Sequence, residues 1–125
     1  MKVLIVEDTK TITNLLQVYL MGWGFEFADA TNGVAGLAKA REFKPDLILS
    51  DVQMPQMDGF ALCAAVRADP ALHATPFVLL TSLKDEASRQ KGRLVGATAF
   101  LNKPISVDDL REKVRTILKL PSSRL

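Results

Sequence analysis

Residues 47–59, "LILSDVQMPQMDG", carry a run of large apolar residues that stops abruptly at Asp51. A Met-Pro pair and then an Asp-Gly pair follow within eight positions, and both are turn signals. A carboxylate at such a place is a helix cap, a solvated loop charge or a chemical group held at the edge of a sheet. The rest of the chain decides among these three readings.

Apolar runs and amphipathic stretches alternate along the chain. Apolar residues from Ile12 to Leu20 recur at the i, i+3, i+4, i+7 spacing of a helix packed on one face. The predicted strands are residues 2–8, 25–30, 47–51, 76–82 and 98–104. The predicted helices are residues 9–21, 33–43, 59–68, 85–96 and 106–120. Strands that alternate with helices and are apolar nearly throughout predict an α/β fold with a parallel sheet covered on both faces.

The bulk properties predict one domain. A chain of 125 residues is long enough for a single sizeable core and too short for two. Its hydrophobic content of 48% and charged content of 24% are ordinary for a globular protein. We expect residues 1–120 to form the domain and residues 121–125, after the helix-breaking Pro121, to form a C-terminal tail.

Several functional classes lack the features that they need. The longest apolar runs, residues 3–6 and 77–80, are far too short to span a membrane, and we expect no signal peptide, because a short apolar run at the start is closed by two acids. A net charge of +2 and an aromatic content of 6% give no support for direct nucleic-acid binding. The lone Cys63 excludes an internal disulfide, and His73 has no partner suggested by spacing. These absences favour a cytoplasmic, reduced setting.

Polar side chains follow four of the predicted strands, at the point where each strand ends. They are Glu7 and Asp8, Asp51, Thr81 and Lys103. Taken alone, each is most simply a cap, a loop charge or a strand former. In a parallel sheet, however, the carboxyl ends of the strands meet at one edge, and ligands bind there where the strand order reverses. Their joint placement therefore predicts a chemical site.

The residue types indicate phosphoryl chemistry assisted by a metal. Crowded carboxylates raise one another's pKa values unless a cation neutralises them, and Mg²⁺ suits such a place because it prefers oxygen ligands. We expect Asp8, Asp51 and a backbone carbonyl near Gln53 to hold the metal, with Glu7 acting directly or through water. Asp51 is then the nucleophile toward phosphorus, while the lysine and the threonine of the set donate hydrogen bonds to the phosphoryl oxygens.

Four segments carry a resemblance to a known family: "VLIVED", "DVQMPQMDGF", "LLTS" and "AFLNKPIS", in this order. They resemble the receiver domain of bacterial two-component response regulators, over about residues 1–120. The resemblance implies a flavodoxin-like (βα)5 fold with a five-stranded sheet in the order 2-1-3-4-5. It also implies that a sensor histidine kinase or a histidine phosphotransfer protein donates the phosphoryl group.

The resemblance implies a role for each matching residue. Asp51 matches the phosphoacceptor, Glu7 and Asp8 the acidic pair, Thr81 the switch hydroxyl, Lys103 the lysine that contacts the phosphoryl group, and Phe100 the switch aromatic. The Lys103–Pro104 peptide bond is expected to be cis, which aims the lysine at the site. Leu83, where many members carry a polar group, and Gln53 together predict slow loss of the phosphoryl group.

The resemblance further implies that phosphorylation changes a face made by the fourth helix, the fifth strand and the fifth helix, and that this face controls a downstream protein. Its two helices carry six cations: Arg89, Lys91, Arg93, Arg111, Lys113 and Arg115. A solvated helix surface explains most of these. The sharper hypothesis is a basic output face for an acidic partner.

The alternatives differ in the output that the same domain would control. Ending just after its fifth helix, the chain is expected to be a single-domain switch similar to a chemotaxis regulator, and an enzyme only toward its own phosphorylation and dephosphorylation. The receiver part of a DNA-binding regulator, or a phosphorylation-independent scaffold, would share its sequence pattern. An aspartate-nucleophile phosphatase is disfavoured, because its D-x-D motif follows the first strand, where this chain has Glu7-Asp8-Thr9.

Overall fold

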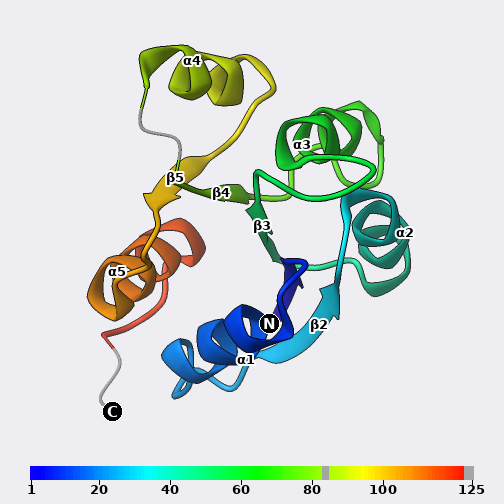
Figure 1. Cartoon of the computed structure of the whole chain (residues 1–125). Helices are drawn as coiled ribbons and strands as arrows, with labels where there is room; N and C mark the ends of the chain where they lie inside the picture. The colour runs from blue at the N-terminus through cyan, green and yellow to red at the C-terminus, as the bar shows by residue number, and fades with distance from the viewer. Residues whose placement is uncertain (83–84, 123–125) are drawn as a thin grey trace.

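Strands and helices alternate strictly in the computed structural model, which describes residues 1–82 and 85–122 (Figure 1). The strands are β1 (Lys2–Val6), β2 (Glu26–Ala30), β3 (Leu47–Asp51), β4 (Phe77–Thr81) and β5 (Ala99–Asn102). The helices are α1 (Lys10–Tyr19), α2 (Gly33–Phe43), α3 (Gly59–Ala68), α4 (Glu86–Leu94) and α5 (Val107–Leu118). Every predicted element is present, and β1 ends at Val6, so the two acids that follow it lie just beyond the sheet.

The five strands form one parallel sheet in the order β2-β1-β3-β4-β5, which confirms the predicted fold. The strand order reverses at β1, because β1 pairs with β2 on one side and with β3 on the other. The register aligns Val6 with both Ala30 and Ser50, and Thr81 with Asn102. The residues that follow these positions therefore meet at one edge of the sheet.

The sheet separates two apolar cores. Helices α1 and α5 cover one face and helices α2 and α3 cover the other, with α4 on the same side as α3 (Figure 1). Successive residues of β1 point to opposite faces, so Ile5 packs toward α1 and α5 while Leu4 and Val6 pack toward α2 and α3. Burial on both faces is why the strands are apolar nearly throughout. No helix within the described residues is long and apolar enough to cross a membrane.

Side chains at four helix starts satisfy backbone N–H groups that would otherwise lack partners. The caps are Asn32 for α2, Asp58 for α3, Asp85 for α4 and Ser106 for α5, each accepting from the residue three positions on. The cap of the helix that follows "LILSDVQMPQMDG" is thus Asp58, whose carboxylate accepts from the Ala61 N–H at 2.8 Å. Asp51 is left for another purpose.

The far end of the sheet is closed by packing around Trp23. The Arg111 guanidinium lies 4.2 Å from the centroid of the Trp23 ring, and the Trp23 indole N–H donates to the Pro121 carbonyl at 3.1 Å. Trp23 therefore has a packing role in this part of the domain. Of the predicted tail, residues 121 and 122 are described, and residues 123–125 lie outside the described residues.

Candidate functional site

Glu7 and Asp8 stand at the point where the strand order reverses. The Glu7 N–H donates to the Ala30 carbonyl at 3.0 Å, which continues the ladder between β1 and β2 by one residue. This bond turns the Glu7 side chain into the protein, where it is 2% exposed, while Asp8 remains exposed to solvent. One buried and one accessible carboxylate thus leave the same strand end.

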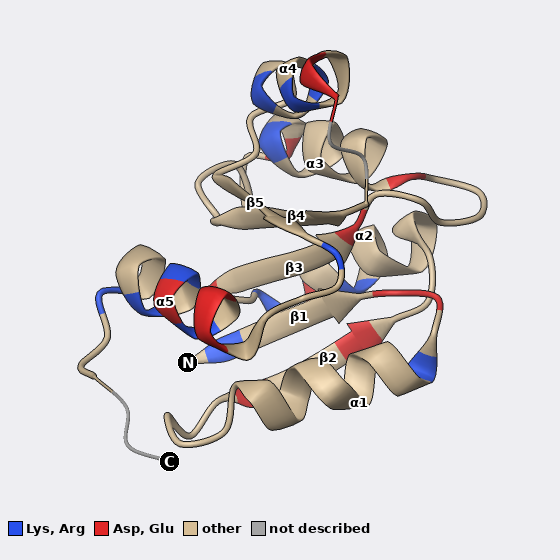
Figure 2. Ribbon diagram, turned by 60° about the vertical axis from the view of Figure 1, so that its left-hand side comes forward, with Lys and Arg blue, Asp and Glu red and all other residues tan. Residues whose placement is uncertain are grey.

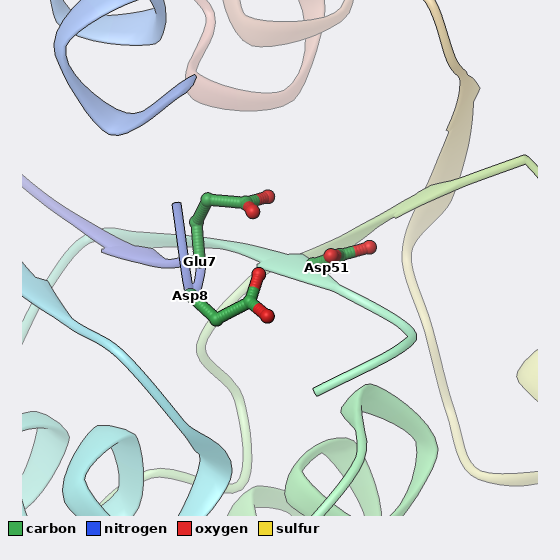
Figure 3. A group of neighbouring side chains, drawn as sticks. All are labelled: Glu7, Asp8 and Asp51. Carbon is green, nitrogen blue, oxygen red and sulfur yellow. The ribbon is translucent and has the colours of Figure 1, made fainter. Parts of the chain in front are cut away.

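Asp51 is the last residue of β3 and is 6% exposed. Figure 3 shows its carboxylate beside those of Glu7 and Asp8, although the three residues come from two different strand ends. One oxygen from each of the three carboxylates lies within 4.8 Å of the other two. Such a cluster of oxygen atoms, open to solvent on the Asp8 side, is suited to a divalent cation.

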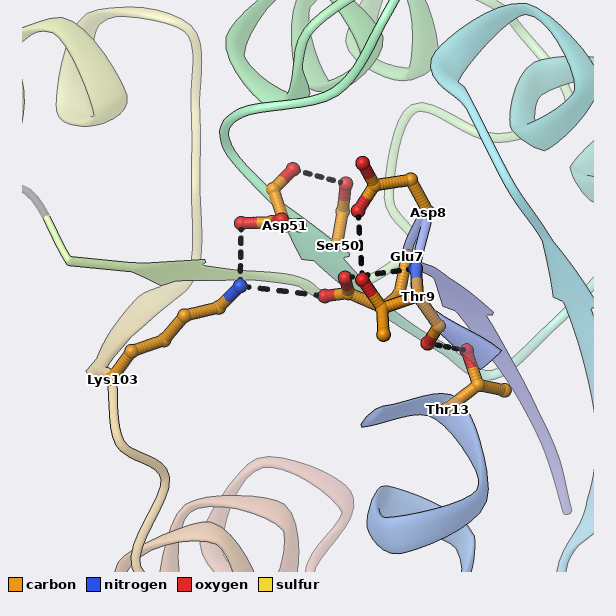
Figure 4. Close-up of polar contacts among 7 residues, drawn as sticks. All are labelled: Glu7, Asp8, Thr9, Thr13, Ser50, Asp51 and Lys103. Carbon is orange, nitrogen blue, oxygen red and sulfur yellow. Dashed lines mark hydrogen bonds and ion pairs between the residues drawn. The ribbon is translucent and has the colours of Figure 1, made fainter. Parts of the chain in front are cut away.

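Lys103 brings the only ammonium that the described residues place in ion pairs with this cluster. Its Nζ lies 3.0 Å from Asp51 Oδ1 and 3.4 Å from Glu7 Oε2 (Figure 4). The Lys103 backbone N–H donates to the Thr81 carbonyl at 2.9 Å, and the Lys103–Pro104 peptide bond is cis. Three carboxylates against one ammonium leave an excess of negative charge that a metal ion would neutralise.

The electrostatics of the cluster show this excess. Burial raises the pKa of Glu7 from 4.5 to about 7, and the Asp51 carboxylate raises it as well, although the Lys103 ammonium acts in the opposite direction. Burial tends to lower the pKa of Lys103, but its hydrogen bonds and charge interactions with Asp51 and Glu7 outweigh this, so the pKa rises. The ammonium therefore stays charged, and Glu7 is the group that holds a proton near neutral pH when no cation is bound.

This shift predicts a pH-dependent cost of folding. The pKa of Glu7 is raised in the folded state, so protonated Glu7 favours the folded state. This contribution to the free energy of unfolding is complete below about pH 4.5 and is lost as the pH rises from there through about 7. In metal-free buffer, we expect the wild type to lose on the order of 2 kcal/mol of unfolding free energy relative to Glu7→Gln over this interval. Urea unfolding of both proteins across the interval measures the difference.

The exposed Glu26 supplies the control. Glu26→Gln is expected to differ from the wild type by less than about 0.5 kcal/mol at every pH. A difference between wild type and Glu7→Gln that stays constant across the interval would contradict the assigned shift of the Glu7 pKa.

Thr81 completes the set at the end of β4. It is 4% exposed, and its register partner Asn102 directly precedes Lys103. The five polar residues predicted from the strand ends are therefore gathered at one edge of the sheet. Gln53 lines a shallow surface cleft together with Asp8, on the loop that follows Asp51. Leu83, invoked for slow loss of the phosphoryl group, lies outside the described residues.

Comparison with known proteins agrees with this geometry. The family profile described as "Response regulator receiver domain" matches residues 3–115. The chain belongs to this family. The receiver domain is 34% identical to protein PilG of Pseudomonas aeruginosa over 88% of the chain and 82% of that protein. It is 32% identical to the DNA-binding dual master transcriptional regulator RpaA of Synechocystis and 37% identical to the response regulator PleD of Caulobacter vibrioides, over 94% of the chain in each case.

The lengths of these relatives differ widely. The chain spans 49% of RpaA and 26% of PleD, so only a part of each of these two proteins corresponds to it. Among solved structures, the chemotaxis response regulator CheY4 of Vibrio cholerae superposes with a TM-score of 0.86 at 36% identity, covering 93% of this chain and 97% of that one. A response regulator from Chloroflexus aurantiacus gives a TM-score of 0.88 at 33% identity, covering 94% and 97%.

The six cations of the receiver domain's last two helices do not form one basic face, so that hypothesis is wrong. The Arg111 side chain turns to the C-terminal end of α1 and donates to the Tyr19 and Met21 carbonyls, both at 2.8 Å. Lys91 leans toward α3, with its Nζ 4.9 Å from the centroid of the Phe60 ring. Helix α4 and helix α5 each carry both signs of charge (Figure 2).

Ion pairs neutralise two more of these cations. Arg93 pairs with Glu86, and Arg115 pairs with Glu112. The groove between α4, β5 and α5 is lined by Arg89 and Lys113 but also by Asp109 and Glu112. A helix turns by about 100° per residue, so cations that are close in sequence point to different neighbours, and the groove is mixed in charge.

Two residues that support the backbone around Asp51 were not singled out in the sequence. The buried Ser50 hydroxyl donates to the Asp51 carbonyl at 2.9 Å, and the Gly59 N–H donates to the Val52 carbonyl at 2.8 Å (Figure 4 shows Ser50). These bonds fix the backbone on which the Asp51 side chain stands. The Asp-Gly pair in the sequence indicated a turn, but it contained no sign that Gly59 packs against the backbone of Asp51.

Proposed function

We propose that this receiver domain is a phosphorylation-controlled switch that accepts a phosphoryl group on Asp51. The observation that carries this proposal is the ion pair of 3.0 Å between Lys103 Nζ and Asp51 Oδ1 beside two further carboxylates. Asp51 is held on a rigid strand end, is nearly buried, and has a cation ready for the charge that arrives with a phosphoryl group. Family membership supports this reading.

The residues suggest how the transfer would proceed. An oxygen of Asp51 attacks phosphorus, a phosphorus–oxygen bond forms, and the bond from phosphorus to the donor's imidazole nitrogen breaks with its electron pair. The imidazole then takes a proton from solvent. The Asp51 oxygen loses its negative charge on becoming an acyl phosphate, so the Lys103 ammonium moves its hydrogen bond to a phosphoryl oxygen. In hydrolysis, water attacks phosphorus, the bond from phosphorus to the Asp51 oxygen breaks, inorganic phosphate leaves and the Asp51 carboxylate is restored.

We propose that Mg²⁺ is held by the carboxylates of Glu7, Asp8 and Asp51 and by the backbone carbonyl of Gln53. The fit rests on three carboxylates within 4.8 Å of one another and on the raised pKa of Glu7. When bound, Mg²⁺ supplies positive charge against the phosphoryl oxygens. The test is intact-mass analysis after incubation with acetyl phosphate. One phosphoryl adduct with Mg²⁺ and none with excess chelator is expected, and an equal yield in both would refute the metal role.

Lys103 is expected to govern the rate at which Asp51 is phosphorylated. Lys103→Met keeps an unbranched apolar stem but removes the cation, and we expect phosphorylation by acetyl phosphate to slow roughly 10- to 100-fold. Stopped-flow or quenched-flow mass analysis measures the rate. Lys113→Met, which removes an exposed cation from α5, is the matched control and should retain the wild-type rate. Equal rates for both variants would remove Lys103 from the mechanism.

We further propose that a sensor histidine kinase or a histidine phosphotransfer protein supplies the phosphoryl group in the cytoplasm. Thr81 and Phe100 then relay its presence to the groove between α4, β5 and α5. That groove then binds a downstream protein. The chain has no other substrate and acts as an enzyme only on itself. Phosphotransfer from purified candidate kinases, ranked by rate, identifies the donor.

A second candidate function, control of a DNA-binding segment, has support from one of the relatives. RpaA is described as DNA-binding and is about twice as long as this chain, which spans 49% of it. The receiver domain would then regulate a DNA-binding segment instead of a separate protein. A phosphorylation-independent scaffold has less support, because Asp51, Thr81 and Lys103 are all present. Failure of every phosphodonor would favour the scaffold.

A further inference from the structure

Helix α4 differs from the other helices in how little of it is buried. Of its nine residues, Gly92 is the one that is buried, whereas α3 buries five residues, including Phe60 and Leu62. A helix normally gains most of its stability from an apolar face packed against the core. Because α4 has almost no such face, a small number of contacts must hold it on the domain.

The first of these contacts is between a ring and the helix backbone. A Cβ atom placed on Gly92 would lie 2.3 Å from Cζ and 2.4 Å from Cε1 of Phe100, which is on β5, and 3.3 Å from Cδ1 of Leu79. The Phe100 ring therefore lies directly on the backbone of α4. Only glycine leaves room for it, since real Cβ atoms do not approach other atoms so closely.

Two cations of α4 also lie over aromatic rings, one over Phe100 itself and the other over Phe60. The Arg89 guanidinium is 5.0 Å from the centroid of the Phe100 ring, and its Nη2 donates to Asn102 Oδ1 on β5 at 2.7 Å. The Lys91 ammonium is 4.9 Å from the centroid of the Phe60 ring on α3. Both distances are within the range of favourable cation–π attraction.

We propose that Arg89, Lys91 and Gly92 form, with the rings of Phe60 and Phe100, a releasable clamp by which α4 detaches as a unit before the rest of the domain unfolds. Each contact in the α4 clamp is modest, so local opening requires far less free energy than global unfolding. Release would uncover both rings and withdraw Arg89 from the groove it shares with β5 and α5. The clamp does not depend on the proposed phosphorylation of Asp51.

Gly92→Ala distinguishes the clamp from intrinsic helix stability, because the two explanations predict opposite changes in the hydrogen-exchange protection of α4. Gly92→Ala raises intrinsic helix propensity, so a helix held mainly by its own backbone would become about fivefold more protected from hydrogen exchange. If the clamp holds α4, the new methyl group displaces the Phe100 ring, and protection of α4 falls instead. Gln90→Ala, at an exposed position of the same turn, is the control.

Hydrogen exchange of the full, unphosphorylated chain, followed by NMR or mass spectrometry, tests the proposal. We expect α4 amides of the wild type to exchange faster than those of α3, and Gly92→Ala to lower α4 protection at least about tenfold while α1 and α3 keep theirs. Gln90→Ala should not lower α4 protection. Increased or unchanged α4 protection in Gly92→Ala would overturn the clamp.

Two methionine variants test the clamp even if Gly92→Ala unfolds the whole domain. Arg89→Met and Lys91→Met keep unbranched side chains with good helix propensity but remove the charges over the two rings. Each is expected to lower α4 protection about two- to fivefold and to leave α1 unchanged. Wild-type protection of α4 in both methionine variants would overturn the proposal.

Discussion

Asp51→Asn is expected to abolish phosphoryl incorporation. The variant keeps the size of the side chain but replaces the carboxylate with a neutral amide that is a poor nucleophile, so nothing remains to attack phosphorus. With acetyl phosphate and Mg²⁺, we expect the rate of adduct formation to fall below about one hundredth of the wild-type rate, as measured by intact mass. The fold should persist, because the substitution removes a charge from a cluster that holds three carboxylates within 4.8 Å.

Asp58→Asn is the matched control for this experiment. Asp58 is on the same loop, and its carboxylate caps α3 by accepting from the Ala61 N–H at 2.8 Å. Asparagine caps helices about as well as aspartate, so the control should fold and accept a phosphoryl group at the wild-type rate. An Asp51→Asn protein that still gained one phosphoryl group at that rate would show that another residue is the acceptor.

Gly59→Ala is expected to cause the largest loss of stability among single methyl additions in the site. A Cβ atom on Gly59 would lie 2.3 Å from the Asp51 carbonyl oxygen, 2.9 Å from the Val52 Cα and 3.1 Å from the Asp51 carbonyl carbon. All three atoms belong to the backbone and cannot rotate away, so α3 must move off the end of β3. We expect a loss of about 3 kcal/mol in unfolding free energy, measured by urea unfolding.

The same displacement of α3 should also disturb the loop beside Asp51. The Gly59 N–H would lose its 2.8 Å bond to the Val52 carbonyl, which holds the loop directly after Asp51. Phosphorylation should therefore slow in any Gly59→Ala protein that remains folded. Ala64→Gly, at an exposed position of α3, reports the ordinary cost of an alanine–glycine exchange in this helix, about 1 kcal/mol. A cost for Gly59→Ala no larger than this would refute the steric account.

The fold and the membership of the site followed from local patterns for a physical reason. Buried parallel strands must be apolar on both faces, so they stand out as short runs, and any polar residue at their ends marks the sheet edge. Glu7, Asp51 and Lys103 were identified in this way. Cap chemistry is also local, but the Asp58-Gly59 pair was interpreted as a turn, and the structure shows that Asp58 is also a helix cap.

The directions of long side chains did not follow from the sequence. Arg111 and Lys91 were assigned to one basic face because they recur along polar helices, yet one packs on Trp23 and the other on Phe60. An arginine or lysine can reach several neighbours from one backbone position. Which neighbour it contacts depends on where the next helix or loop lies, and that is a property of the assembled domain.

By itself, the sequence determined the alternation of strands and helices, the edge at which polar residues gather and the chemical types available there, because hydrophobic periodicity and strand ends are local properties. Only the tertiary structure decided that Lys103 pairs with both Asp51 and Glu7, that Glu7 is buried enough to hold a proton near neutral pH, and that Gly59 and Gly92 must lack side chains. These features depend on which atoms from distant segments come within a few ångströms, and no local pattern encodes that distance.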